Sequence, residues 1–267
     1  MQRSGHAARR RTAVILGTNE TASAIAVVLH RAAYNVVMSQ DDDYPVLRRK
    51  MSFYDALFNE SAKLEQIRAE RADNGVQIAN ALRHSDLVQV TWLGLPDLMP
   101  AGPIDLLIDA RLQPWRVRPD LRRLARFSVG LGAGFVAAAN CDAAVEVPDL
   151  GMLDAHCCTA APRGGRWHCA LQIGEPIRCG MVVGYLDDNA LRAPCAGVLR
   201  GVVRDGQAVA AGMTLLEIDP RGRHAQWSGI DDGNRAVARA LMRTLETPLI
   251  RDVAAPVHAV PEPRFPA

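Results

Sequence analysis

Apolar and polar positions at the start of the chain follow a pattern typical of an α/β protein. A continuous apolar run at residues 13–16 ends at Gly17, where a polar turn begins. Apolar residues then recur at intervals of three and four between residues 25 and 32, which predicts an amphipathic helix, and a second apolar run covers residues 36–38. A strand, a helix and a strand in this order predict a right-handed parallel crossover, the opening unit of a doubly wound fold.

Three later apolar segments predict further buried strands of the same sheet: residues 87–93, 104–109 and 127–131. A glycine-rich stretch, LGAGF, follows the last of them. The polar segment at residues 53–80 is compatible with helix, and the basic, proline-broken segment at residues 114–126 predicts a connector. We therefore expect an α/β fold with a Rossmann-like parallel sheet over residues 13–148.

The second half shows a different pattern, in which an irregular stretch at residues 149–178 precedes short strand-like runs. These runs lie at residues 181–186, 191–193, 197–203 and 213–219. Asp205-Gly206, between two of the runs, is a typical hairpin turn. Together they predict a small all-β module over residues 149–222.

The remaining segments complete the predicted organisation. Residues 231–246 begin with acidic residues and place apolar ones along one side, which predicts an amphipathic helix within a C-terminal segment of residues 223–247. We expect a flexible basic tail at residues 1–12 and a disordered, proline-rich tail at residues 248–267.

Charge and composition narrow the class of protein. The chain holds 31 basic and 29 acidic residues, so its net charge of +2 provides no overall field to bind nucleic acid or an anionic membrane. The apolar run after the basic N-terminal residues is too short for a signal peptide or a membrane span, and the six cysteines show no disulfide framework. We therefore predict a cytoplasmic protein that binds neither nucleic acid nor membrane.

The segment at residues 191–222 resembles half of a biotinyl or lipoyl carrier domain. Its Ala-Pro pair, spaced glycines and alternating apolar residues predict a barrel-sandwich of β-strands. In a carrier the modified lysine would fall near Leu186 and Asp187, but lysine occurs in this chain only at Lys50 and Lys63. Because biotin and lipoate are attached to a lysine amine, the sequence predicts that neither is carried.

Six stretches of the chain, taken in order between residues 13 and 245, carry a resemblance to a known family: VVLHRAAYNVVMSQ, YPVLRRKMSFYDALF, LLIDARL, VGLGAGFVAAANCDAAVE, RAPCAGVLRGVVRDG and EIDPRG. They resemble the selenium-dependent molybdenum hydroxylase accessory family, a distant relative of the xanthine dehydrogenase accessory proteins. The resemblance implies an accessory or maturation protein that binds the cofactor or the client enzyme of a molybdenum-type hydroxylase. The implied partners are a client oxidoreductase or the subunits of a larger complex, and a homo-oligomer is a further alternative.

The chain departs from the family pattern at three places. Its first turn has one glycine, Gly17, instead of Gly-x-Gly; Gln40 stands where an acidic residue for a ribose hydroxyl is usual; and residues 148–153 lack an expected Arg-Gly-His stretch. Two alternatives therefore stay open, a degenerate non-catalytic scaffold of a larger enzyme complex and a nucleotide-dependent enzyme. No catalytic motif stands out, so no catalytic residue is predicted, and the ligand stays open between a nucleotide and a molybdopterin-type compound.

The first candidate ligand-binding residues lie in the turn after the first strand. Gly17, Thr18 and Asn19 would place backbone N–H groups and a hydroxyl at a helix N-terminus, where anions bind. The alternative is that Thr18 or Asn19 only caps the helix. Three aspartates at residues 41–43 would reach a ribose, but such a run more often forms a solvated loop.

Two arginines and an aspartate are further candidates. Arg48 and Arg49 would bind a phosphate or carboxylate, as on a molybdopterin-type ligand, with the alternative that they form surface ion pairs. Asp109 ends a predicted strand at the sheet edge where α/β folds bind ligands. Its alternative role is to cap a helix or to pair with Arg111.

The last candidates are glycines and soft ligands. Gly132 and Gly134 would let the backbone approach a ligand, although packing explains them equally well. A cluster of histidines and cysteines at residues 156–169 offers thiol and imidazole groups, but no Cys-x-x-Cys or His-x-x-x-His spacing is present, so no metal site is predicted. A reactive cysteine for sulfur or selenium handling stays an alternative to buried and loop thiols.

Overall fold

The computed structural model describes residues 10–113, 116–148 and 156–246. Its largest element is an eight-stranded sheet whose members are β1 (Thr12–Leu16), β2 (Asn35–Ser39), β3 (Ser61–Leu64), β4 (Ile67–Arg71), β5 (Val88–Thr91), β6 (Leu106–Asp109), β7 (Phe127–Leu131) and β8 (Ala143–Val145). Their order is β3-β4-β5-β2-β1-β6-β7-β8. All neighbours pair in parallel except β3 and β4, which form an antiparallel hairpin.

The six central strands, β5-β2-β1-β6-β7-β8, have the 3-2-1-4-5-6 order of a doubly wound sheet. The direction of winding reverses between β1 and β6, and sheets of this kind bind ligands beside the carboxyl ends of the strands at that point. All five positions of β1 are buried, because a parallel sheet is covered on both faces. The predicted strands at residues 87–93, 104–109 and 127–131 are confirmed as β5, β6 and β7.

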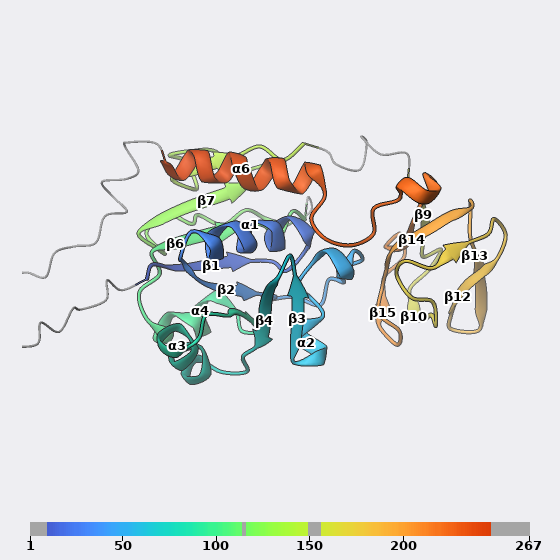
Figure 1. Cartoon of the computed structure of the whole chain (residues 1–267), viewed down its shortest axis with the longest axis horizontal. Coiled ribbons are helices and arrows are strands. Elements are labelled where there is room, and N and C mark those ends of the chain that lie inside the picture. The colour runs from blue at the N-terminus through green and yellow to red at the C-terminus, as the bar shows by residue number, and fades with distance from the viewer. Residues whose placement is uncertain (1–9, 114–115, 149–155, 247–267) are drawn as a thin grey trace, which may run out of the picture.

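Helices cover both faces of the large sheet (Figure 1). The helices α1 (Glu20–Arg31) and α6 (Asp232–Glu246) pack against each other on one face, whereas α3 (Gly75–His84) and α4 (Leu95–Leu98) lie on the other. A short helix, α2 (Ala56–Asn59), precedes β3. The helix expected at residues 231–246 is therefore confirmed, and it packs on the large sheet.

The second half forms two further four-stranded sheets, in which every pairing is antiparallel. Their strands are β9 (Cys157–Ala160), β10 (Gly165–His168), β11 (Pro176–Ile177), β12 (Val182–Leu186), β13 (Asn189–Arg192), β14 (Gly197–Val202), β15 (Ala208–Val209) and β16 (Thr214–Asp219). The sheet orders are β13-β12-β10-β15 and β11-β14-β16-β9. A separate apolar core that includes Trp167, Leu199 and Leu215 belongs to this part. We call it the β part, and it lies at one end of the large sheet in Figure 1.

The glycines of the β part serve two different purposes. Gly206 and Gly212 have φ angles of +77° and +80°, as expected for hairpin corners. Gly197 instead permits close approach, because a Cβ atom there would lie 2.3 Å from the carbonyl oxygen of Asp219 on the neighbouring strand.

Two regions differ from the sequence prediction. Residues 53–80, predicted as helix-compatible, contain the β3–β4 hairpin, whose turn residues Glu65 and Gln66 have φ angles of 46° and 70°. Such angles normally require Asn or Gly, so the usual hairpin signal is missing from the sequence. The stretch at residues 149–178, predicted as irregular, contains β9, β10 and β11.

The cysteines also differ from expectation. The sequence showed no disulfide framework, but the structure joins Cys157 of β9 to Cys195, just before β14. The remaining four cysteines are free. In the described part of the chain no helix is long and apolar enough to cross a membrane. The tail predicted at residues 248–267, and all but three residues of the one predicted at 1–12, lie outside the described residues.

Candidate functional site

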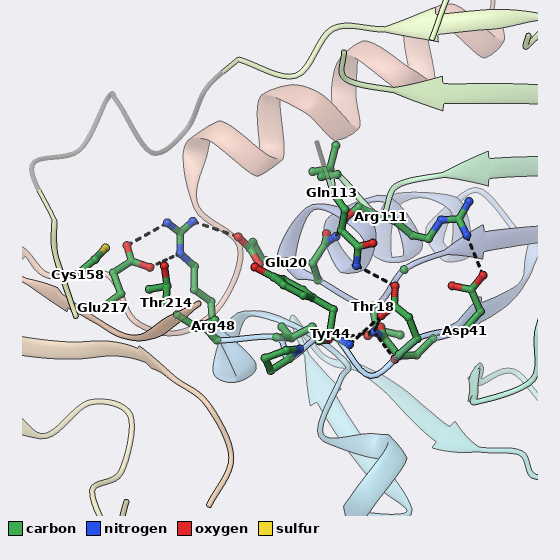
Figure 2. Close-up of a pocket in the computed structure, with 18 of the residues that line it drawn as sticks. Thr18, Glu20, Asp41, Tyr44, Arg48, Arg111, Gln113, Cys158, Thr214 and Glu217 are labelled. Atoms are coloured by element: carbon green, nitrogen blue, oxygen red, sulfur yellow. Dashed lines mark hydrogen bonds and ion pairs between the residues drawn. The ribbon is translucent and has the colours of Figure 1, made fainter. Parts of the chain in front are cut away.

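A cavity of about 350 Å³ opens where the winding of the large sheet reverses. Loops after β1, β2 and β6 form one side of it, and β9 and β16 of the β part form the other (Figure 2). We call this cavity the crevice. Its lining residues are Gly17, Thr18, Asn19, Glu20, Gln40, Asp41, Asp42, Tyr44, Pro45, Val46, Leu47, Arg48, Arg111, Leu112, Gln113, His156, Cys158, Thr214 and Glu217.

The three predicted residues of the first turn all line the crevice. Gly17 has a φ angle of +106°, and a Cβ atom there would lie 3.1 Å from the carbonyl oxygen of Ala110, so this position favours glycine. Asn19 caps α1, because its side-chain oxygen accepts from the Ala22 N–H at 2.9 Å. Thr18 is buried and donates to Oε1 of Gln40 at 2.5 Å. Each of the three residues therefore has a structural role that requires no ligand.

Ion pairs attach the loop after β2 to the loop after β6. Oδ2 of Asp41 accepts from Arg111 at 2.8 Å and from Arg116 at 3.0 Å. Oδ2 of Asp42 accepts from Arg116 at 2.7 Å and from Gln113 at 2.8 Å. The first two aspartates therefore form a partly buried ion-pair network with the loop after β6, whereas a solvated loop was expected for all three.

Asp109 does not line the crevice, since its side chain is completely buried against Arg111. Nε and Nη2 of Arg111 donate to the two oxygens of Asp109 at 3.0 and 2.5 Å, and Nη1 donates to Asp41. Burial lowers the pKa of Arg111, but the hydrogen bond and charge of Asp109 outweigh burial, and the pKa is raised. Asp109 therefore pairs with Arg111, which the sequence analysis gave as the alternative to ligand binding.

Arg48 and Arg49 point to different sites. Arg48 lines the crevice, where Nε and Nη2 donate to Glu217 at 2.7 and 3.0 Å and Nη1 donates to Glu20 at 3.2 Å (Figure 2). Burial opposes the charge of Arg48, but Glu20 and Glu217 raise its pKa. Arg49 instead donates to the Val202 carbonyl at 3.1 Å and pairs with Asp55.

A buried charged cluster continues from Glu217 into the β part. Nδ1 of His156 lies 2.6 Å from Oε1 of Glu217, and Nη1 of Arg200 lies 3.2 Å from Nε2 of His156. Nε2 of His156 also lies 3.6 Å from Oδ2 of Asp219, so carboxylates lie near both ring nitrogens. Nη2 of Arg200 donates to Asp231 at 2.9 Å, and Asp231 caps the start of α6 through the Asn234 N–H. The crevice is thereby connected to the helix that packs on the large sheet.

The predicted His/Cys cluster is dispersed. Cys157 is in the disulfide, His168 lies 3.2 Å from Asp205, and Cys158 lines the crevice. Burial and, to a smaller extent, Glu217 raise the pKa of the Cys158 thiol, which disfavours its thiolate. Among the described residues, no three His, Cys, Asp or Glu side chains gather as metal ligands would.

Gly132 and Gly134 lie outside the crevice lining. Their φ angles are +79° and +88°, and Cβ atoms there would lie 3.2 Å from Leu112 and 3.0 Å from Arg118. The observed geometry accounts for both glycines by turn conformation and packing.

Sequence reasoning did not single out several lining residues: Glu20, Tyr44, Gln113, Thr214 and Glu217. Glu217 carries a usable signal, because a charged residue inside the apolar run TLLEID is buried with a partner or functional. Tyr44 and Gln113 lie in loops, whereas Glu20 begins α1 and Thr214 begins β16, and only the folded chain brings them together.

Comparisons with known proteins include a sequence relative and a distant solved structure. No family model matches the chain. It is 24% identical over 270 residues to Uncharacterized protein YqeB of Escherichia coli (strain K12), an alignment that covers 92% of this chain and 49% of the relative. The chain thus spans about half the length of this curated relative. A solved aspartoacylase family protein from Mesorhizobium loti aligns over 79% of this chain at 12% identity, with a TM-score of 0.23.

Proposed function

We propose that the chain is a ligand-binding accessory protein that holds a small molecule in the crevice and acts on behalf of a larger enzyme. The observation that carries the proposal is the position of the crevice, at the reversal of a doubly wound sheet and between two parts of the chain. The resemblance to accessory proteins of molybdenum hydroxylases points to such an enzyme as the client. A maturation factor that handles a cofactor needs a site of this kind and a surface for its client.

We also infer a domain organisation that agrees with this role. A Rossmann-like domain would extend over residues 13–148 and a barrel-sandwich over residues 149–222, with the segment at residues 223–247 returning to the first domain. The strand order of the large sheet, the two antiparallel sheets and the packing of α6 on α1 support these assignments. In that organisation the crevice is an interdomain site, which is a common place for ligands.

The binding part of the proposal is tested with a variant that fills the crevice. Cys158 and Cys179 are both exposed free cysteines, but only Cys158 lines the crevice. Molybdopterin and adenosine are the probes in calorimetry, and Cys158→Trp is expected to abolish binding of the probe that the wild type binds, whereas Cys179→Trp is the matched control and should bind as the wild type does. Equal binding by both variants would place the ligand elsewhere.

The client part needs a separate experiment. Purified chain is mixed with the apoenzyme of a molybdenum hydroxylase, and the mixture is separated by size-exclusion chromatography. Co-elution is the expected result. If the chain binds neither molybdopterin nor the apoenzyme, the accessory role in molybdenum enzyme maturation is wrong, and a scaffold in a different complex becomes the better hypothesis.

A further inference from the structure

We infer, resting on the proposed function, that the crevice selects a compact ligand without phosphate groups. Such a ligand presents hydroxyl or amino hydrogens to the acidic end of the crevice and an apolar face to its loop wall, as a nucleoside does. The inference follows from the charges, hydrogen bonds and shape of the lining.

The lining charges disfavour an anion. Five carboxylates, counting Asp109 behind Arg111, face three guanidiniums, counting Arg116 behind Asp41 and Asp42, which leaves two negative charges in excess before His156 is counted. The other carboxylates belong to Glu20 and Glu217 and the other guanidiniums to Arg48 and Arg111, while Arg200 beside Glu217 is balanced by Asp231. A pyrophosphate or a molybdopterin phosphate would enter against this excess.

Every guanidinium nitrogen of the two lining arginines already donates to a carboxylate. Each of the three guanidinium nitrogens of Arg48 donates to Glu217 or Glu20, and each of those of Arg111 donates to Asp109 or Asp41. Two N–H groups of each guanidinium have no carboxylate partner, so a phosphate there would lie beside carboxylates that already neutralise the arginine. Displacing one of these partly or completely buried carboxylates would leave it unpaired, which is strongly unfavourable. The crevice therefore lacks the free guanidinium that phosphate recognition requires.

The acidic end can accept further hydrogen bonds. Oδ2 of Asp41 is occupied by two arginines, but its Oδ1 is buried without a hydrogen-bond partner. A buried acceptor without a partner costs roughly 1–3 kcal/mol, so a hydroxyl or amino hydrogen donated there would be favoured. A ligand that donates at this end matches the lining, whereas an anionic ligand does not.

The opposite wall and the size of the crevice complete the description of the ligand. Pro45, Val46, Leu47 and Leu112 supply apolar surface. The volume of about 350 Å³ lies near the lower end of the range for small-molecule sites, roughly 300–1,000 Å³. A flat ring with an attached sugar fits this combination better than a dinucleotide.

The test compares matched probes that differ in charge. Adenosine, guanosine, cytidine and uridine are titrated into the full chain by calorimetry, alongside their 5′-triphosphates and molybdopterin. We expect at least one nucleoside to bind at least about tenfold more tightly than its triphosphate, since one unfavourable charge interaction of this size is about a factor of ten. Binding should be lost in Cys158→Trp and kept in Cys179→Trp.

A gain of affinity distinguishes charge selection from misfolding. The double variant Glu20→Gln/Asp42→Asn removes two lining carboxylates, and it should bind the triphosphate more tightly than the wild type does, which an unfolded protein cannot do.

If a triphosphate or molybdopterin binds the wild type more tightly than any nucleoside, and Cys158→Trp abolishes that binding, the inferred ligand class is wrong while the proposed function stands. If no nucleoside binds, the ligand class is also wrong. Nucleoside binding that survives Cys158→Trp would place the site elsewhere and contradict the crevice itself.

Discussion

Glu217→Gln is expected to destabilise the fold by about 3 kcal/mol, which is large for a single charge removal. Glu217 is 6% exposed, accepts two hydrogen bonds from Arg48, and lies 2.6 Å from His156. Breaking a buried ion pair by removing one partner typically costs about 3–5 kcal/mol, because the other charge stays buried. Arg48 retains Glu20 at 3.2 Å and is 13% exposed, which places the expected loss at the lower end of that range.

The measurement is urea unfolding at pH 7, followed by circular dichroism and by tryptophan fluorescence. Glu146→Gln is the matched control, because Glu146 is exposed at the end of β8, and surface substitutions usually change stability by less than about 0.5 kcal/mol. Arg48→Met/Glu217→Leu removes both charges and should recover part of the loss, since neither Arg48 nor Glu217 is then left buried without the other. A difference between Glu217→Gln and the control below about 1 kcal/mol would refute the assignment of this pair as a buried contact between the two parts.

Three further predictions address other features. Burial would raise the pKa of Asp219, but hydrogen bonds from Arg221 and the Gln226 backbone outweigh it and hold the pKa far below its usual range. The stabilisation is therefore complete above the usual carboxyl pKa of about 4 and is lost gradually as the pH falls toward the much lower folded-state pKa. Asp219→Asn should lower urea stability most at pH 7, and its difference from the wild type should shrink steadily as the pH is lowered from about 5 to about 2. Thiol titration in denaturant should find four free cysteines before reduction and six after it, and six from the start would contradict the Cys157–Cys195 bond. Gln66→Gly should raise the free energy of unfolding by about 1 kcal/mol, because Gln66 has a φ of 70°, whereas Lys63→Gly within β3 should lower it.

Sequence patterns predict the central sheet well because its strands are short apolar runs buried on both faces. Residues 127–131 show this directly, since the predicted strand and β7 have the same bounds. The β3–β4 hairpin was missed because its turn carries Glu65 and Gln66 where left-handed turns usually carry Asn or Gly. The fold class could therefore be predicted from the periodicity of apolar residues, but that periodicity carries no information about an unusual turn.

The part of the candidate site that a single segment builds was predictable from the sequence. The first turn brings Gly17, Thr18 and Asn19 to the crevice because strand, turn and helix are contiguous in sequence. Arg48 and Arg49 are adjacent in sequence, yet they face different partners, Glu217 and Val202, that lie more than 150 residues away. No local pattern contains that information, since the partners are set by how the β part lies against the loop after β2.

The same contacts join the two parts of the chain and shape the crevice, which links ligand choice to stability. Arg48 connects Glu20 at the start of α1 to Glu217 on β16, so a ligand that competes for Arg48 also weakens the contact between the large sheet and the β part. The backbone bond from Val202 N–H to the Leu47 carbonyl, at 3.0 Å, would then carry more of that contact. A ligand that leaves the Arg48 pairs intact and donates to Asp41 instead adds stability without this loss. Linkage therefore favours uncharged donors over anions in the crevice, for the same physical reason that Glu217→Gln is expected to be costly.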